Sequence, residues 1–175
     1  HDTIIKSAVV GDGVTSIGDF AFCGCSSLTS VTIGNDVTSI GDDAFALCAN
    51  LTDVTFGNNV TSIGEEAFYN CDSLVCITIP DSVGYIYQEA FAYCKGLESV
   101  KVQAETPPFA YDNTFSNYEI ELCVPEKSVE TYQKTNPWSK FKTFKNLTDD
   151  DFEVKVCATP TIAYVNGKIS FASET

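Results

Sequence analysis

The sequence of 175 residues contains no arginine, no methionine, one tryptophan and a single histidine, His1, at its start. The sequence therefore offers almost no histidine for a catalytic triad, a general base or a metal site. Basic residues are also scarce, since 24 acidic side chains stand against ten lysines and give a net charge of -14. Nucleic acids and anionic membranes require a basic surface, so we expect neither as a partner. The composition argues against an enzyme.

Long apolar runs are missing as well. No stretch approaches the roughly 18 apolar residues of a membrane-spanning helix, so we expect no direct membrane insertion. The first ten residues lack the basic and then apolar layout of a signal peptide, and without methionine the sequence is expected to be a segment of a longer protein. Apolar residues make up 44% of the chain, which is typical of a folded domain rather than of an acidic disordered chain.

A repeat of 23 residues organises the first part of the chain. Four segments align without a gap from Val14, Val37, Val60 and Val83, and the first of them is VTSIGDFAFCGCSSLTSVTIGND. Self-similarity at this period is the signature of a solenoid in which each repeat forms one coil. A single coil cannot bury enough apolar surface to fold alone, so neighbouring coils must share a core and the hydrogen bonds between their strands.

Each coil is predicted to contain one short strand and one short helical turn. The segments 31–33, 54–56 and 77–79 alternate with period two and are rich in β-branched residues, which favours a strand with one buried face. Turn residues follow each of them. The stretches 18–25 and 64–71 place acidic residues at their beginning, which favours a short helix.

The pattern I-x-x-x-A-F-x-x-C-x-x-L-x-x-V-x-I at this period resembles the leucine-rich repeats of the BspA-like class of bacterial surface proteins. The resemblance covers residues 14–105 and implies a leucine-rich repeat solenoid, an α/β-type right-handed coil of short parallel strands and short helical turns. Residues 1–13 are similar to the end of a preceding repeat. Residues 106–146 are predicted to form a shortened fifth coil and a C-terminal cap.

The predicted cap begins with a short amphipathic helix from Pro125, which Pro137 ends. Trp138, Phe141 and Phe144 would then cover the last coil, whose open apolar face would otherwise aggregate. Capping is a better use of Trp138 than a ligand site.

Residues 147–175 are predicted to contain an acidic linker and a β-hairpin. Two alternating runs flank Asn166-Gly167, which is a strong hairpin signal. The sequence resembles the start of a small β-sandwich module that follows such repeats in surface proteins of gut bacteria, and two strands alone are only marginally stable.

The eight cysteines fall into two groups. The first group occupies one repeat position and should stack about 4.8 Å apart: Cys25, Cys48, Cys71 and Cys94. Buried thiols acting as small apolar side chains are the favoured interpretation, with disulfides between neighbours as the alternative. The second group breaks the pattern: Cys23, Cys76, Cys123 and Cys157. A linear column cannot present four sulfurs tetrahedrally, so no zinc site is expected.

Acidic pairs recur at one position of the coil, at 42–43 and 65–66. Because they lie beside the predicted helix start, the favoured role is helix-end electrostatics and solubility rather than catalysis or calcium binding. The run 149–151 lacks the alternating spacing and the glycine of a calcium loop. We therefore expect neither a metal nor a cofactor.

The outward positions of the strands form the best candidate binding surface, because the strand ladder of a solenoid lines an extended concave face. The predicted binding residues are Ser30, Thr32, Asp53, Thr55, Cys76, Thr78, Ser99, Lys101, Glu119 and Glu121. These side chains are mostly small and polar and include no aromatic or arginine anchor. A face that merely keeps the sheet soluble is an equal alternative.

Three functions are consistent with these features. The resemblance implies a non-enzymatic, extracellular or cell-surface module for recognition or adhesion that binds a partner protein through the strand-lined face. A structural spacer that displays a downstream β-module is the alternative. A glycan-binding module is the third, for which Tyr85, Tyr87 and Tyr93 in the last repeat are the only aromatic indication.

Overall fold

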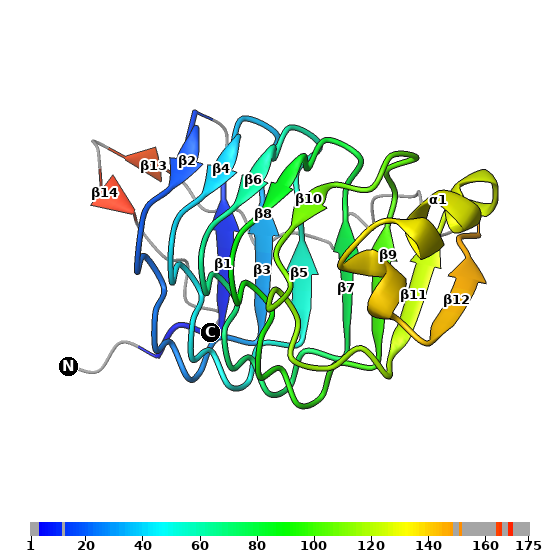
Figure 1. The fold of residues 1–175 in the computed structure, drawn as a ribbon. Helices are drawn as coiled ribbons and strands as arrows, with labels where there is room; N and C mark the ends of the chain where they lie inside the picture. The colour runs from blue at the N-terminus through cyan, green and yellow to red at the C-terminus, as the bar shows by residue number, and fades with distance from the viewer. Residues whose placement is uncertain (1–3, 12, 149–150, 152–163, 166–167, 170–175) are drawn as a thin grey trace.

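The computed structural model describes residues 4–11, 13–148, 151, 164–165 and 168–169. Its repeats form a parallel β-solenoid, as predicted (Figure 1). One row of strands contains β1 (Ser7–Val10), β3 (Ser30–Ile33), β5 (Asp53–Thr55), β7 (Cys76–Ile79), β9 (Ser99–Val102), β11 (Glu121–Val124) and β12 (Thr143–Asn146). Their outward side is called the ladder face below. The register confirms the repeat, because Ser7 pairs with Ser30 and Ser30 pairs with Asp53.

A second parallel sheet lies on the other side of each coil (Figure 1). It consists of β2 (Ser16–Ile17), β4 (Ser39–Ile40), β6 (Ser62–Ile63), β8 (Tyr85–Ile86) and β10 (Phe109–Ala110). Each of these strands has only two residues, of which the isoleucine or alanine is buried and the other is directed outward. Elements this short give almost no periodicity in the sequence, which is why the repeat pattern predicts one strand per coil and not two.

The predicted helical turn is wrong: the stretches 18–25, 41–48, 64–71 and 87–94 contain hydrogen-bonded turns and no helix. Alternate N–H groups donate to the next coil, as from Phe20 to the Asp42 carbonyl at 2.9 Å and from Phe22 to the Ala44 carbonyl at 2.7 Å. The residues between them bond within the coil, as from Cys23 to the Phe20 carbonyl at 3.1 Å. A helix would need every N–H for itself. These stretches therefore form a third ladder, called the turn column below.

Two positions of the turn column have a left-handed backbone in every repeat. The first is occupied by Phe20, Asp43, Glu66 and Glu89, with φ between 52° and 57°, and the second by Gly24, Leu47, Asn70 and Tyr93, with φ between 56° and 72°. Only glycine and asparagine adopt this conformation readily, so the packing of the coils holds the other residues in it.

The acidic pairs do not sit at helix ends, since no helix is present there. The aspartate at the first of these positions bonds the next coil in the first two repeats: Asp19 Oδ1 accepts the N–H of Asp42 at 2.9 Å, and Asp42 Oδ1 accepts the N–H of Glu65 at 2.8 Å. Burial and the neighbouring carboxylates raise the pKa of Asp43 and of Glu66. The acids therefore join consecutive coils as well as solvating the turn column.

The core is a stack of identical side chains. Five phenylalanine rings follow one another along the solenoid with centroid separations of 5.1, 5.1, 5.3 and 5.5 Å: Phe22, Phe45, Phe68, Phe91 and Phe115. The cysteine column runs beside them. Cys48, Cys71 and Cys94 are buried free thiols, as predicted, whereas Cys25 at the start of the column is a free thiol that is only partly buried. The Sγ atoms of the three buried cysteines each donate to a phenylalanine carbonyl of the preceding coil at 3.1–3.3 Å.

The cap closes the last coil as predicted. It contains the 3-10 helix η1 (Glu126–Ser128), the helix α1 (Val129–Lys134) and the 3-10 helix η2 (Trp138–Lys140). Trp138 is fully buried, its ring lies 5.9 Å from that of Phe115, and its Nε1 donates to the Pro108 carbonyl at 2.8 Å. The hydroxyl of Tyr132 donates to the Ala104 carbonyl at 2.8 Å. Trp138 therefore ends the phenylalanine stack, and its polar atom is satisfied.

The C-terminal runs pair as the sequence predicts. β13 (Tyr164–Val165) and β14 (Lys168–Ile169) form an antiparallel pair, while Asn166, Gly167 and Cys157 lie outside the described residues. Among the residues that the structure describes, no helix has the length and apolar character that a membrane crossing requires.

Candidate binding groove on the ladder face

The structure places nine of the ten predicted binding residues on the ladder face. Strands β3, β5, β7 and β9 each contribute two outward side chains, and all eight are at least partly exposed. Glu119 is the exception, since it lies before β11 rather than on it. Ser99 pairs with Glu121 and Lys101 with Cys123, so the fifth coil continues the face with Glu121 and Cys123. That these residues bind a partner stays a prediction.

The ladder is interrupted in its middle. Strands β1, β3 and β5 form one sheet, and β7, β9, β11 and β12 form another, so that β5 and β7 are not paired. The second sheet continues across the same junction through β4 and β6, and so does the turn column. The sequence predicts one uninterrupted ladder through Val31, Val54, Ile77 and Val100, and this expectation is wrong between Val54 and Ile77.

Two substitutions set the third repeat apart from the first two at this junction. At the end of the strand, the Gly34 N–H donates to the Val10 carbonyl at 2.8 Å and the Gln103 N–H to the Ile79 carbonyl at 3.0 Å. Pro80 occupies this position in the third repeat and has no N–H to donate. A Cβ built on Gly57 would lie 2.4 Å from the Gly34 carbonyl oxygen, so the preceding coils meet here too closely for any side chain.

The other end of the strand has lost its anchor too. The hydroxyl of Thr29 donates to the Lys6 carbonyl at 2.9 Å, and that of Thr52 donates to the Thr29 carbonyl at 3.0 Å. Val75 takes this position in the third repeat and cannot make the bond. Its side chain is 48% exposed instead. The strand of the third repeat therefore lacks, at both of its ends, the hydrogen bonds that would join it to the second repeat.

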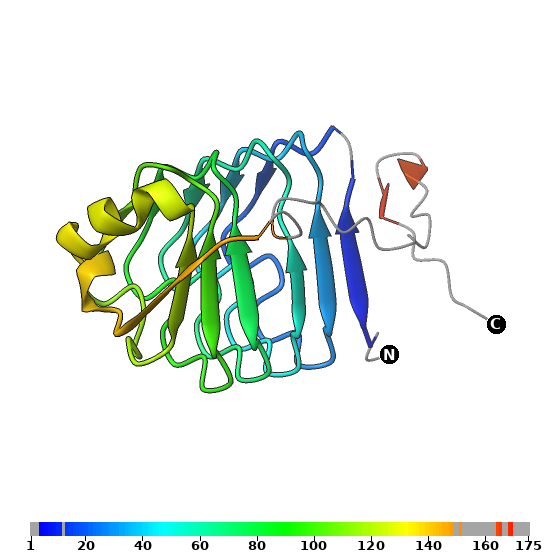
Figure 2. The same ribbon diagram turned by 90° about the vertical axis from the view of Figure 1, so that its right-hand side faces the viewer.

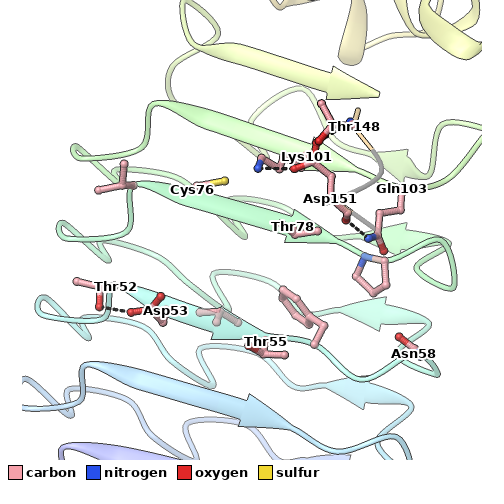
Figure 3. A pocket seen from close by; sticks show the side chains of 14 residues that line it. Thr52, Asp53, Thr55, Asn58, Cys76, Thr78, Lys101, Gln103, Thr148 and Asp151 are labelled. Atoms are coloured by element: carbon pink, nitrogen blue, oxygen red, sulfur yellow. Dashed lines mark hydrogen bonds and ion pairs between the residues drawn. The ribbon is translucent and has the colours of Figure 1, made fainter. Parts of the chain in front are cut away.

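The opening forms a groove of about 620 Å³ between β5 and β7 (Figure 3). Its walls include Asp53, Thr55, Cys76 and Thr78, four of the predicted binding residues. In the register that the paired strands share, carbonyl groups of β5 and the N–H groups of Cys76 and Thr78 face this opening. Such backbone edges are templates for an added strand.

The chain itself contacts one side of the groove. Figure 2 shows the strands of the ladder face side by side, and Thr148 and Asp151, which follow β12, lie against this face. Asp151 Oδ1 lies 2.6 Å from Lys101 Nζ. Gln103 Nε2 donates to the backbone carbonyl of Asp151 at 2.5 Å, and Thr148 donates to its carboxylate through both N–H and hydroxyl (Figure 3). The ladder face thus holds both the side chain and the main chain of a peptide residue.

This contact stabilises two charges. The hydrogen bond with Asp151 raises the pKa of Lys101. Burial opposes the ionisation of Asp151, but hydrogen bonds from Lys101 and Thr148 outweigh it and hold the pKa of that carboxyl below its usual value. Asp151 is therefore a carboxylate at neutral pH, and Lys101 is a cation.

The thiols of the cysteine column should be inert in the folded protein. Burial raises the pKa of Cys48 to about 12 and that of Cys94 to about 11, and it also raises the pKa of Cys71. Because the thiolate is the nucleophile, iodoacetamide at pH 8 should label Cys76 well before these three, as mass spectrometry of the peptides would show. Equal labelling of Cys48 and Cys76 in the native state would contradict the assignment.

The same shifts predict a loss of stability in alkali. Unfolded thiols ionise from about pH 9, whereas the buried ones stay protonated to higher pH, so the stability that they contribute is complete below pH 9 and is lost as the pH rises toward the folded value of about 12 for Cys48. A variant with alanine at positions 48, 71 and 94 should lose less stability between pH 9 and pH 11. Urea denaturation across this range measures the difference.

No group of three or more His, Cys, Asp or Glu side chains is arranged to hold a metal ion within the described part of the chain. The polar groups of the groove are backbone edges, hydroxyls, two amides, one lysine and carboxylates. This set is suited to holding an extended polypeptide.

A parallel solenoid with short strands, a stacked core and a cap defines the class of leucine-rich repeat proteins. The model of the family described as BspA type leucine rich repeat region matches residues 1–121, in six copies. The chain belongs to this family.

Solved structures agree with the assignment. A leucine rich cell surface protein from Faecalibacterium prausnitzii is 26% identical with a TM-score of 0.57, over 85% of this chain and 34% of that one. A leucine-rich repeat protein from Bacteroides capillosus is 35% identical with a TM-score of 0.51, over 58% of this chain and 78% of that one. The pneumococcal vaccine antigen PcpA, at 16% identity, a TM-score of 0.64, and coverage of 82% of this chain and 41% of that one, shares the fold.

The chain thus spans about a third of the length of the Faecalibacterium protein, since 34% of that chain is covered. No curated protein sequence matches this one.

Proposed function

We propose that the protein is a non-enzymatic recognition module of a bacterial cell-surface protein, and that it binds an extended segment of a partner protein in the groove between β5 and β7. The surface location is supported by the family and by the cell-surface protein that it resembles. The observation that carries the binding proposal is the interruption of the ladder, which exposes two backbone edges in the middle of the predicted binding face.

The contact of Asp151 supports the same mode of binding. Lys101 binds its carboxylate while Gln103 binds its main-chain carbonyl, which is how a surface selects an acidic residue of an extended peptide. Both side chains come from the β9 side of β7 and line the same groove, so a partner segment in the groove can reach them across β7. We therefore expect a preference for segments that carry an acidic residue.

The test closes the groove while keeping the hydroxyl, amide, lysine and carboxylate side chains that line it. Val75→Thr together with Pro80→Gly restores the residues that the first repeats carry at these positions, so the variant should fold and pair β5 with β7. We expect the wild-type chain to bind within a panel of immobilised extracellular-matrix proteins, and to bind individual linear peptides on an array derived from the panel. The closed variant should lose this binding at least about tenfold, which corresponds to 1.4 kcal/mol.

Thr32→Ser is the matched control, because Thr32 lies on the same face where the ladder is paired. It should bind as the wild type does. Retained binding by the closed variant, or no binding to any member of the panel, would overturn the groove as the site. A parent protein that binds equally well after deletion of residues 14–105 would favour the alternative of a structural spacer.

A further inference from the structure

The second sheet carries an aromatic surface that the groove does not involve. Tyr85 of β8 and Phe109 of β10 are 57% and 53% exposed, and Tyr87, directly after β8, is 43% exposed. Tyr111 directly follows β10 and is partly exposed. We call these four residues the aromatic platform. Large exposed aromatic side chains on adjacent strands of a folded domain mark an interaction site.

The rings form one connected surface. Tyr85 lies 6.2 Å from Phe109, Tyr87 lies 6.2 Å from Tyr111 at an interplanar angle of 29°, and Phe109 meets Tyr111 edge-on at 5.1 Å. The hydroxyls of Tyr118 and Tyr132 donate to carbonyls. Within the described part of the chain, the hydroxyls of Tyr85, Tyr87 and Tyr111 have no such partner and remain available to a ligand.

The fold does not require aromatic residues at these positions. Strand pairing aligns Tyr85 with Ser62, Ser39 and Ser16 of the earlier repeats. Tyr87 likewise takes the place of glycine in all three of those repeats. The platform therefore rises from a strip of serine and glycine residues that runs along the second sheet.

We infer that the aromatic platform binds a neutral linear glycan, which extends from the rings along the serine and glycine strip. Ring faces pack on the C–H face of a pyranose while phenol and serine hydroxyls bond its polar edge. The coils repeat every 4.8 Å or so, which is about the length of one sugar unit. The net charge of -14 disfavours anionic polymers. A peptide with apolar anchors would need pockets rather than a flat strip of hydroxyls.

Tyr93, which the sequence groups with Tyr85 and Tyr87, does not belong to the platform. It lies in the turn column, where its ring packs 5.2 Å from that of Tyr69. Its side chain is 52% exposed, similar to those of Tyr85 and Phe109. Tyr93 therefore serves as an exposed aromatic control at a different place on the same coil.

Affinity electrophoresis of the full chain in gels that contain a soluble neutral β-glucan, mannan or starch provides the test. We expect retardation by at least one of these polymers and none by polygalacturonate or a sulfated polysaccharide. Tyr85→Ser and Tyr87→Gly install the residues of the preceding repeat, so the fold is kept, and each should weaken the retardation at least about tenfold. Tyr93→Asn installs the residue of the preceding repeat at the control position and should leave the retardation unchanged.

The proposal for the groove and the proposal for the aromatic platform can be tested independently. The variant with Val75→Thr and Pro80→Gly should be retarded as the wild type is, because those residues lie on the ladder face. No retardation by any neutral polymer would overturn the inference, and so would unchanged retardation of Tyr85→Ser and Tyr87→Gly. Binding of proline-rich peptides that these two variants abolish, without glycan binding, would assign the platform to protein recognition instead.

Discussion

Replacing Phe68 by alanine should lower the free energy of unfolding by about 3–5 kcal/mol. Phe68 is fully buried in the middle of the phenylalanine stack, 5.1 Å from Phe45 and 5.3 Å from Phe91. It also meets Phe56 edge-on at 5.9 Å. The variant loses contacts on both sides, and the surrounding rings cannot collapse into the space because each is fixed by its own coil. Guanidinium denaturation followed by circular dichroism measures the loss.

Phe22→Ala is the control within the same stack. Phe22 is only partly buried and stacks on Phe45 at 5.1 Å, so its replacement should cost distinctly less than that of Phe68. Phe20→Ala changes a side chain that is 62% exposed and should alter the stability by no more than about 0.5 kcal/mol. If Phe68→Ala and Phe22→Ala lowered the free energy of unfolding equally, the phenylalanine stack would not be the core of the solenoid.

Gly64→Ala should destabilise the protein by about 1–3 kcal/mol, because it forces neighbouring coils apart. A Cβ at this position would lie 2.6 Å from the carbonyl carbon and 2.7 Å from the carbonyl oxygen of Gly41. These are backbone atoms, so the coil as a whole must move. The effect is measured by the same denaturation experiment.

Gly18→Ala provides a matched control for this substitution. Gly18 occupies the same repeat position, but no atom lies within 4 Å of a Cβ built there, because β2 is the first strand of its sheet. Alanine should be neutral at Gly18 or should stabilise the protein slightly through the unfolded chain. If both variants lose the same stability, the requirement for glycine comes from the local backbone and not from the approach of the coils.

The sequence predicts the solenoid, the cysteine column, the cap and the C-terminal hairpin correctly because their signals are local and repeated. The helical turns are wrong for a physical reason: the spacing of Ala44, Phe45 and Cys48 is compatible with a helix, but hydrogen bonds to the next coil decide the backbone. The helix propensity of the residues within one repeat contains no information about the hydrogen bonds between repeats.

The fifth coil shows why part of the candidate sites could not be predicted. Phe91 bridges Phe115, which is 24 residues later, whereas Ser99 pairs with Glu121, which is 22 residues later. The insertion and the deletion fall on opposite sides of one turn, so a fixed period of 23 fails on both sides of it. It would align Tyr85 with Pro108 instead of Phe109, and Ser99 with Leu122 instead of Glu121.

Pro80 is visible in the sequence as a turn residue, yet its main consequence depends on the register. Only when the coils are stacked does it become clear that the missing N–H lies where the second and third repeats should pair. The groove therefore lies where Pro80 lacks an N–H and Val75 lacks a hydroxyl, which no pattern of apolar residues reports.

The interruption between β5 and β7 also has a mechanical meaning. At every other junction between the four repeats, the strand ladder, the second sheet and the turn column all join one coil to the next, but the strand ladder does not join the second repeat to the third. A load applied along the axis is thus carried unevenly at this point. We expect the solenoid to bend there first, as a hinge that opens on the ladder face.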